Sequence, residues 1–161
     1  ALQLTNILLD WPQDVRQGRC YVPRKWLAEH GIRPSNLVGA PNEAARDLSL
    51  RLESRARAAL ARVPDYLALV PATARRYRLF VLLPAVWALR SIVRARRNPE
   101  FPWGERRPKL SRSELWAAGI AAVVGQGTLD ELRRCAASPE PAPHAAVSRP
   151  AGGDSMSRTS R

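Results

Sequence analysis

Residues 3–14 read Gln3-Leu4-Thr5-Asn6-Ile7-Leu8-Leu9-Asp10-Trp11-Pro12-Gln13-Asp14, and this stretch of the 161-residue chain decides its fold. On a helix, which turns about 100° per residue, side chains three and four positions apart share a face. One face then carries the polar side chains of Gln3, Asn6, Asp10 and Asp14, which we call the ridge. The neighbouring face carries an apolar stripe of Leu4, Ile7, Leu8, Trp11 and Val15. The spacing predicts an amphipathic helix over residues 1–16.

The ridge has the chemistry of a magnesium site. Carboxylate and amide oxygens are hard ligands, and Mg²⁺ usually takes one or two carboxylates together with water and phosphate oxygens. Two acids four residues apart also occur on ordinary solvated helix faces, so the spacing alone leaves that alternative open. Pro12 lacks a backbone donor, and it predicts a kink or an early end of the helix that would re-aim Asp14.

The loop after this helix carries Gly18-Arg19-x-Tyr21-x-Pro23. Together with Gln3-Leu4-Thr5-Asn6-Ile7 and Asp10-x-x-x-Asp14, it resembles the second aspartate-rich motif of the squalene and phytoene synthase family. The stretch Trp26-Leu27-Ala28-Glu29-His30-Gly31-Ile32 continues the resemblance. Over about residues 40–135 the resemblance is diffuse, carried by helical patterning and by Arg107-x-Lys109-Leu110-Ser111-Arg112, and after about residue 136 it is absent.

The resemblance implies an all-α fold, part of an isoprenoid-synthase-type helical bundle around a central apolar cavity. Residues 1–135 would be the C-terminal portion of such a domain. Family members carry two aspartate-rich motifs, whereas Asp47, Asp65 and Asp130 each lack an acidic partner four residues on. We therefore expect the C-terminal half of a longer protein, with a short, degenerate relative as the alternative.

The resemblance also implies an enzyme, a transferase that condenses two prenyl diphosphates head to head with Mg²⁺. The loop and helix patterns after residue 70 resemble bacterial squalene-type members more than plant-like phytoene synthases. This resemblance favours the squalene type, which couples two farnesyl diphosphates through presqualene diphosphate. The alternatives are a phytoene synthase that uses geranylgeranyl diphosphate, or a non-catalytic helical relative that acts as an interaction or membrane-docking module. NADPH serves some family members, but no GxGxxG motif in this sequence supports it.

Site residues follow from the same resemblance. Asp10 and Asp14 would be catalytic and would bind the metal, with Asn6 as a further ligand. Gln3, Asn6, Arg19 and Tyr21 would contact the substrate, although packing of the loop explains Arg19 and Tyr21 equally well. The family commonly has Arg and Glu directly before the two acids, and here Leu9 and Gln13 stand there, which leaves catalytic strength open.

The formal charge of the chain is +12, and the excess is concentrated between residues 74 and 112, with eleven Arg or Lys and two acids. Nucleic acid is not expected as a partner, because no binding motif or interleaved aromatic residues accompany the charge. Contact with an anionic membrane surface fits a water-insoluble product, and an ordinary solvated basic face is the alternative. The chain has two cysteines, Cys20 and Cys135, which are too few for a disulfide framework. We expect a cytoplasmic protein, with peripheral attachment to the inner face of the membrane as the alternative.

Further helices are expected to about Val63, over residues 72–97 and from Arg112 to Val124, with Asn42 as an N-cap. Ser111-x-x-Glu114 and Thr128-x-x-Glu131 have the spacing of capping boxes. Residues 136–161 are rich in Pro, Ala, Ser, Gly and Arg and contain little to bury. We expect them to form a disordered tail.

Overall fold

The computed structural model describes residues 1–105, 107–124 and 127–134, and this part of the chain is helical without any β-strand. Its elements are α1 (Leu2–Arg16), α2 (Arg24–Glu29), the 3₁₀ helix η1 (Pro34–Leu37), α3 (Glu43–Leu60), α4 (Val63–Ala68), α5 (Arg75–Arg96), α6 (Arg112–Val124) and α7 (Gly127–Arg134). The all-α prediction is confirmed. The expected tail, residues 136–161, lies outside the described residues.

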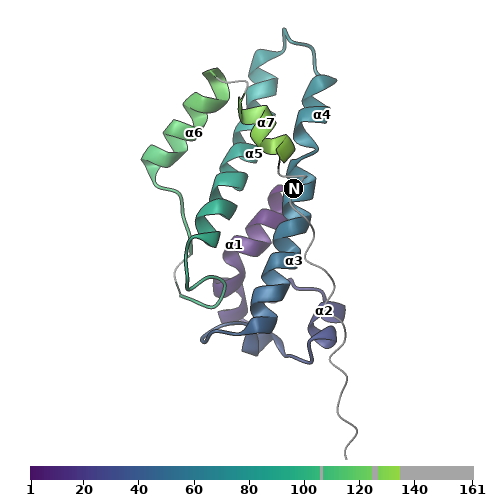
Figure 1. Cartoon of the computed structure of the whole chain (residues 1–161), viewed down its shortest axis with the longest axis vertical. Helices are drawn as coiled ribbons and strands as arrows, with labels where there is room; N and C mark the ends of the chain where they lie inside the picture. Colours follow the sequence, from purple (N-terminus) through teal and green to yellow (C-terminus); the bar gives the residue numbers. More distant parts are fainter. Residues whose placement is uncertain (106, 125–126, 135–161) are drawn as a thin grey trace, which may run out of the picture.

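The helices form an elongated bundle (Figure 1). Helices α3 and α4 follow one another along the long axis, the chain then turns, and α5 returns beside them. Helix α1 packs against both α3 and α5, and α7 contacts α4, α5 and α6. Helix α6 stands at the side of the bundle, where it contacts α5 and α7.

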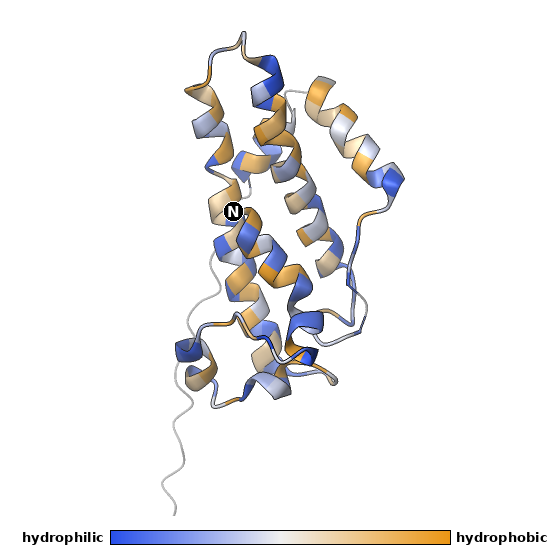
Figure 2. Cartoon of the chain, turned by 180° about the vertical axis from the view of Figure 1, so that it is seen from behind, coloured by the Kyte–Doolittle hydropathy of each residue, from blue (hydrophilic) through white to orange (hydrophobic). Residues whose placement is uncertain are grey.

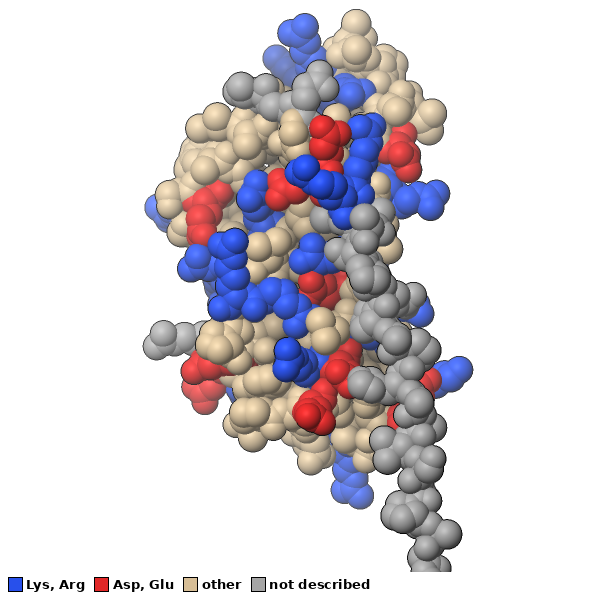
Figure 3. Space-filling view, viewed as in Figure 1, with Lys and Arg blue, Asp and Glu red and all other residues tan. Residues whose placement is uncertain are grey.

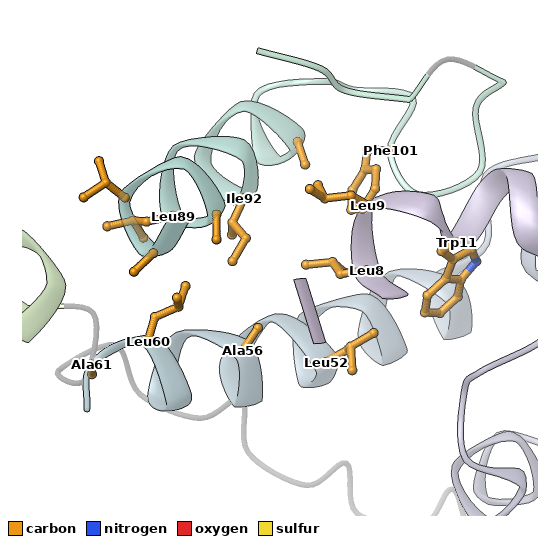
Figure 4. Packing of buried hydrophobic residues seen from close by; sticks show 14 of the residues in the cluster. Leu8, Leu9, Trp11, Leu52, Ala56, Leu60, Ala61, Leu89, Ile92 and Phe101 are labelled. Atoms are coloured by element: carbon orange, nitrogen blue, oxygen red, sulfur yellow. The ribbon is translucent and has the colours of Figure 1, made fainter. Parts of the chain in front are cut away.

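The core lies where α1 meets α3 and α5 (Figure 4). Leu8 and Leu9 of α1 point toward α3 and α5, and the labelled side chains that surround them are Leu52, Ala56, Leu60, Leu89, Ile92 and Phe101. All of these side chains are buried. Because burying a large aliphatic side chain contributes about 1.5–3 kcal/mol, this cluster fixes α1 firmly. The ridge is therefore carried by one of the best-anchored helices of the bundle.

Capping hydrogen bonds form at two helix N-termini where the sequence predicts them. The Asn42 side chain accepts a hydrogen bond from the Ala45 N–H at 3.1 Å and caps α3. Ser111 and Glu114 form the predicted capping box, with Ser111 N–H to Glu114 Oε2 at 2.8 Å and Glu114 N–H to Ser111 Oγ at 3.2 Å. The second box is wrong, because Thr128 lies inside α7 and its hydroxyl donates to the Ala121 carbonyl at 3.1 Å.

Proline does not interrupt α1 and α5, the two described α-helices that carry it beyond their first turn. Helix α1 continues through Pro12 to Arg16, so the expected early end does not occur. Pro12 is buried, and the packing of the whole apolar stripe offsets the lost backbone hydrogen bond. Helix α5 likewise continues through Pro84.

Two helices, α5 and α6, carry large apolar side chains that are exposed to solvent. In α5, Phe80 belongs to the apolar run Leu79–Leu89, yet it is 74% exposed. On α6 the side chains of Trp116, Ile120 and Val123 are also exposed, and Figure 2 shows that this helix is apolar over much of its length. Among the described helices, none is both long enough and apolar enough to cross a membrane.

Candidate functional site

The ridge begins on the solvent side of α1. Gln3 and Asn6 are exposed, and neither side chain makes a hydrogen bond to another described residue. Asp10 and Asp14 follow on the same face and are half-buried. Residues four apart on a helix lie about 5–6 Å from each other at Cβ, so the two carboxylates are neighbours. The structure thus brings the predicted ligands Asn6, Asp10 and Asp14 onto one face of one helix.

Asp10 is paired with an arginine from the loop before α6. Arg107 Nε lies 2.6 Å from Asp10 Oδ1, which is an ion-pair distance. Within the described part of the chain, this buried oxygen accepts no hydrogen bond. The ion pair with Arg107 therefore holds the Asp10 carboxylate in place on the ridge.

Asp14 is paired with the loop that follows α1. Arg19 Nη2 lies 3.2 Å from Asp14 Oδ1. Gly18, with φ of +76°, lets the chain turn back, and the Arg19 N–H donates to the Asp14 carbonyl at 2.8 Å. Because glycine adopts this left-handed conformation without strain, the loop keeps Arg19 beside the second carboxylate.

Tyr21 closes the loop over the end of α1. A small hollow of about 10 Å³ is lined by Asp14, Arg19 and Tyr21 and by apolar side chains that include Trp11 and Val15. The structure therefore places three predicted site residues together, although 54% of the Tyr21 side chain is exposed. A hollow of this size holds no prenyl chain, so the arrangement here is a packed loop next to the ridge.

The donor set of the ridge fits Mg²⁺ with a phosphorylated ligand. Among the described residues, no three or more His, Cys, Asp or Glu side chains come together as a protein-only metal cage. Magnesium rarely needs such a cage, since water and substrate phosphates fill most of its octahedral shell. Asp10 and Asp14 with the amide oxygen of Asn6 supply the one or two carboxylates and the further oxygen that such a site uses.

Arg107 is the site residue that the sequence did not single out. Its segment was noted only for its resemblance, and nothing in its spacing indicates that it lies at Asp10. The contact depends on how the loop after α5 returns to α1, which is a property of the tertiary fold. Charge complementarity was the one available signal, and the many arginines of this chain make that signal weak.

Comparisons with known proteins agree on one family. The family model described as squalene/phytoene synthase matches residues 1–114. A 15-cis-phytoene synthase from Pantoea ananas is 29% identical over 151 residues, which cover 88% of this chain and 44% of that protein. A 15-cis-phytoene synthase from Enterobacter agglomerans is 49% identical over 45 residues, 28% of this chain and 15% of the relative. A phytoene synthase from Rhodobacter capsulatus is 36% identical over 58 residues, 35% of this chain and 17% of the relative.

The chain spans less than half the length of these curated relatives. No solved structure matches it. The resemblance seen in the sequence is confirmed by the family match. The preference for a squalene-type member is not specifically supported, because the relatives above carry the name phytoene synthase.

Proposed function

Because the chain belongs to the squalene/phytoene synthase family, we propose that the protein condenses two prenyl diphosphates head to head and that it is of the phytoene type. The observation that carries this proposal is the ridge, two carboxylates and two amides on a helix fixed by the core. The names of the relatives favour geranylgeranyl diphosphate over farnesyl diphosphate as substrate. This replaces the squalene-type interpretation of the sequence.

In the proposed reaction, the C–O bond of one substrate breaks and its electron pair leaves with the diphosphate. The double bond of the second substrate then attacks the allylic cation and forms the new C–C bond, and the positive charge that moves to the second substrate is discharged by loss of a proton. The diphosphate of the second substrate leaves in a later ionisation, and loss of a second proton gives the hydrocarbon. Bound Mg²⁺ would supply positive charge that stabilises the departing diphosphate. Asp10, Asp14 and Asn6 would hold the metal through their side-chain oxygens.

The arginines beside the ridge support the same chemistry. Arg107 and Arg19 lie against Asp10 and Asp14 and balance the charge of the two carboxylates. Guanidinium groups next to a metal-bound diphosphate can donate hydrogen bonds to its oxygens, and such preorganised donors stabilise the developing charge. Leu9, in the place where the family commonly has Arg, is buried in the core and adds no positive charge at the ridge. We propose that Arg107 and Arg19 contribute the charge there.

Product identity tests the proposal. The full-length protein is incubated with Mg²⁺ and either geranylgeranyl or farnesyl diphosphate, with and without NADPH, and the hydrocarbon products are separated by chromatography and identified by mass. We expect phytoene from geranylgeranyl diphosphate, and no change in product when NADPH is added. A product formed from farnesyl diphosphate alone would restore the squalene type, and no product from either substrate would favour a non-catalytic relative.

A further inference from the structure

A groove lies between α5 and α6, away from the ridge residues. Its volume is about 270 Å³, and three of its lining residues are arginines: Arg90 and Arg94 of α5, and Arg97, which directly follows this helix. These positions share a helix face, since they are four and three residues apart. Figure 3 shows Lys and Arg side chains gathered in a band on this face of the molecule, next to the C-terminal end of α5.

Apart from Glu114, the other wall of the groove is apolar, and on α6 it is made of alanines. Leu110, Ala117 and Ala121 are among the residues that line it. Alanine projects only a methyl group, so α6 leaves space open opposite the arginines. A groove with guanidinium groups on one side and methyl groups on the other is complementary to an amphipathic anion.

The arginines are available to an incoming anion. Arg94 Nη1 contacts Glu114 Oε1 at 2.8 Å, and Arg90 Nη2 contacts Glu131 Oε2 at 2.9 Å, but both arginines are exposed to water and Glu131 is half-buried. Exposed ion pairs contribute little, because water competes for both partners. The Arg97 side chain is exposed and makes no ion pair or hydrogen bond with any described residue.

The acid in the groove is engaged elsewhere. Hydrogen bonds from the backbone N–H of Ser111 lower the pKa of the Glu114 carboxyl, and Arg94 lowers it further. Since one oxygen of Glu114 is held by the capping box, this carboxylate can remain in place when Arg94 turns to another partner. Three guanidinium groups against one carboxylate leave the lining with an excess of positive charge.

We propose that the groove between α5 and α6 binds the phosphate group of an amphipathic phosphate ester, with the start of its hydrocarbon chain on the wall formed by Leu110, Ala117 and Ala121. Guanidinium groups bind phosphate oxygens bidentately, which explains why arginines line one side. The volume of about 270 Å³ is just below the range for ligand pockets, about 300–1,000 Å³. It suits a head group and the adjoining carbons better than a whole prenyl chain. A soluble prenyl phosphate and a phospholipid head group share this chemistry.

Binding is measured by calorimetry on the full-length protein in EDTA, so that the ridge holds no metal. The probes are farnesyl monophosphate and, in a separate arm, vesicles of phosphatidylglycerol against vesicles of phosphatidylcholine. The double variant Arg94→Ala/Arg97→Ala should bind farnesyl monophosphate at least about tenfold more weakly, since charge-assisted hydrogen bonds are lost. The matched control Arg62→Ala/Arg76→Ala removes two exposed arginines outside the groove and should change binding less than about twofold.

A further variant tests the apolar wall. Ala117→Phe fills the groove beside the arginines. It should weaken the binding of farnesyl monophosphate, whereas the binding of inorganic phosphate, a further probe without a hydrocarbon chain, should be weak and unchanged. Equal losses in the two arginine doubles would overturn the proposal, as would the absence of binding to every probe. If the protein binds only vesicles of phosphatidylglycerol, and Arg94→Ala/Arg97→Ala abolishes this binding, the ligand is a lipid head group. Retained binding in Asp10→Asn/Asp14→Asn separates this site from the proposed catalytic function.

Discussion

Glu53 joins the two longest helices of the bundle through a buried ion cluster. Only 9% of its side chain is exposed, and it lies on α3 with one oxygen 2.7 Å from Arg57 Nε. Its other oxygen is paired with Arg96 of α5. One carboxylate therefore serves two guanidinium groups across the helix interface, where water reaches it poorly.

Replacing Glu53 by Ala should be costly. Removing one partner of a fully buried ion pair typically costs about 3–5 kcal/mol, because the other charge is left without compensation. Both arginines here keep some contact with water, so we expect a loss of about 2–3 kcal/mol. Glu29→Ala is the matched control. Glu29 Oε2 contacts Arg51 Nη1 at 2.6 Å, but 40% of its side chain is exposed, and the expected loss is below about 1 kcal/mol.

Urea unfolding followed by circular dichroism gives both losses on the same scale. Equal slopes for the two variants and the parent show that the comparison is sound. If Glu53→Ala and Glu29→Ala differ by less than about 0.5 kcal/mol, the buried cluster does not stabilise the α3–α5 interface and the reasoning from burial fails.

Three further predictions concern the core and the helix ends. Leu8→Ala should lower the free energy of unfolding by about 3 kcal/mol, because Leu8 is 1% exposed; a loss below about 1 kcal/mol in urea titration would contradict this packing. Asn42→Ala should cost about 1 kcal/mol by removing the cap of α3, and Asn42→Asp should restore it. The lowered pKa of Glu114 implies that its contact stabilises α6 above the ordinary carboxyl pKa and that this support is lost as the pH falls through the lowered value. Amide exchange in α6 at falling pH checks this, and the dependence should disappear in Glu114→Gln.

Local chemistry allowed much of the fold to be predicted. The apolar stripe of α1, the Asn42 cap and the Ser111–Glu114 box act within a few residues, so spacing in the sequence is enough to place them. Spacing in the sequence was not enough at Pro12. Helix α1 continues through this residue because tertiary packing outweighs the cost of a proline inside a helix. The exposure of Phe80 could not be predicted either, because an apolar run in the sequence does not show which neighbouring helices cover each of its side chains.

Long-range contacts between charges could not be predicted. Glu53 looks like one of many charged residues on α3, and only the crossing of α3 and α5 buries it against Arg96. The pair between Asp10 and Arg107 likewise joins distant segments. A sequence with 26 Arg and Lys offers many partners for each acid, and the fold alone selects among them. The roles of the ridge residues stay predictions.

The central claim is that Asp10 and Asp14 hold a metal-bound diphosphate, and one measurement tests it directly. Turnover of geranylgeranyl diphosphate is followed against Mg²⁺ concentration for Asp10→Asn, Asp14→Asn and the control Asp65→Asn, whose carboxylate is exposed on α4. Each ridge variant should lose at least about a hundredfold in turnover with unchanged helix content, while the control keeps its rate. Near-parental turnover in both ridge variants would show that the ridge is only a solvated face of α1 and would contradict the account.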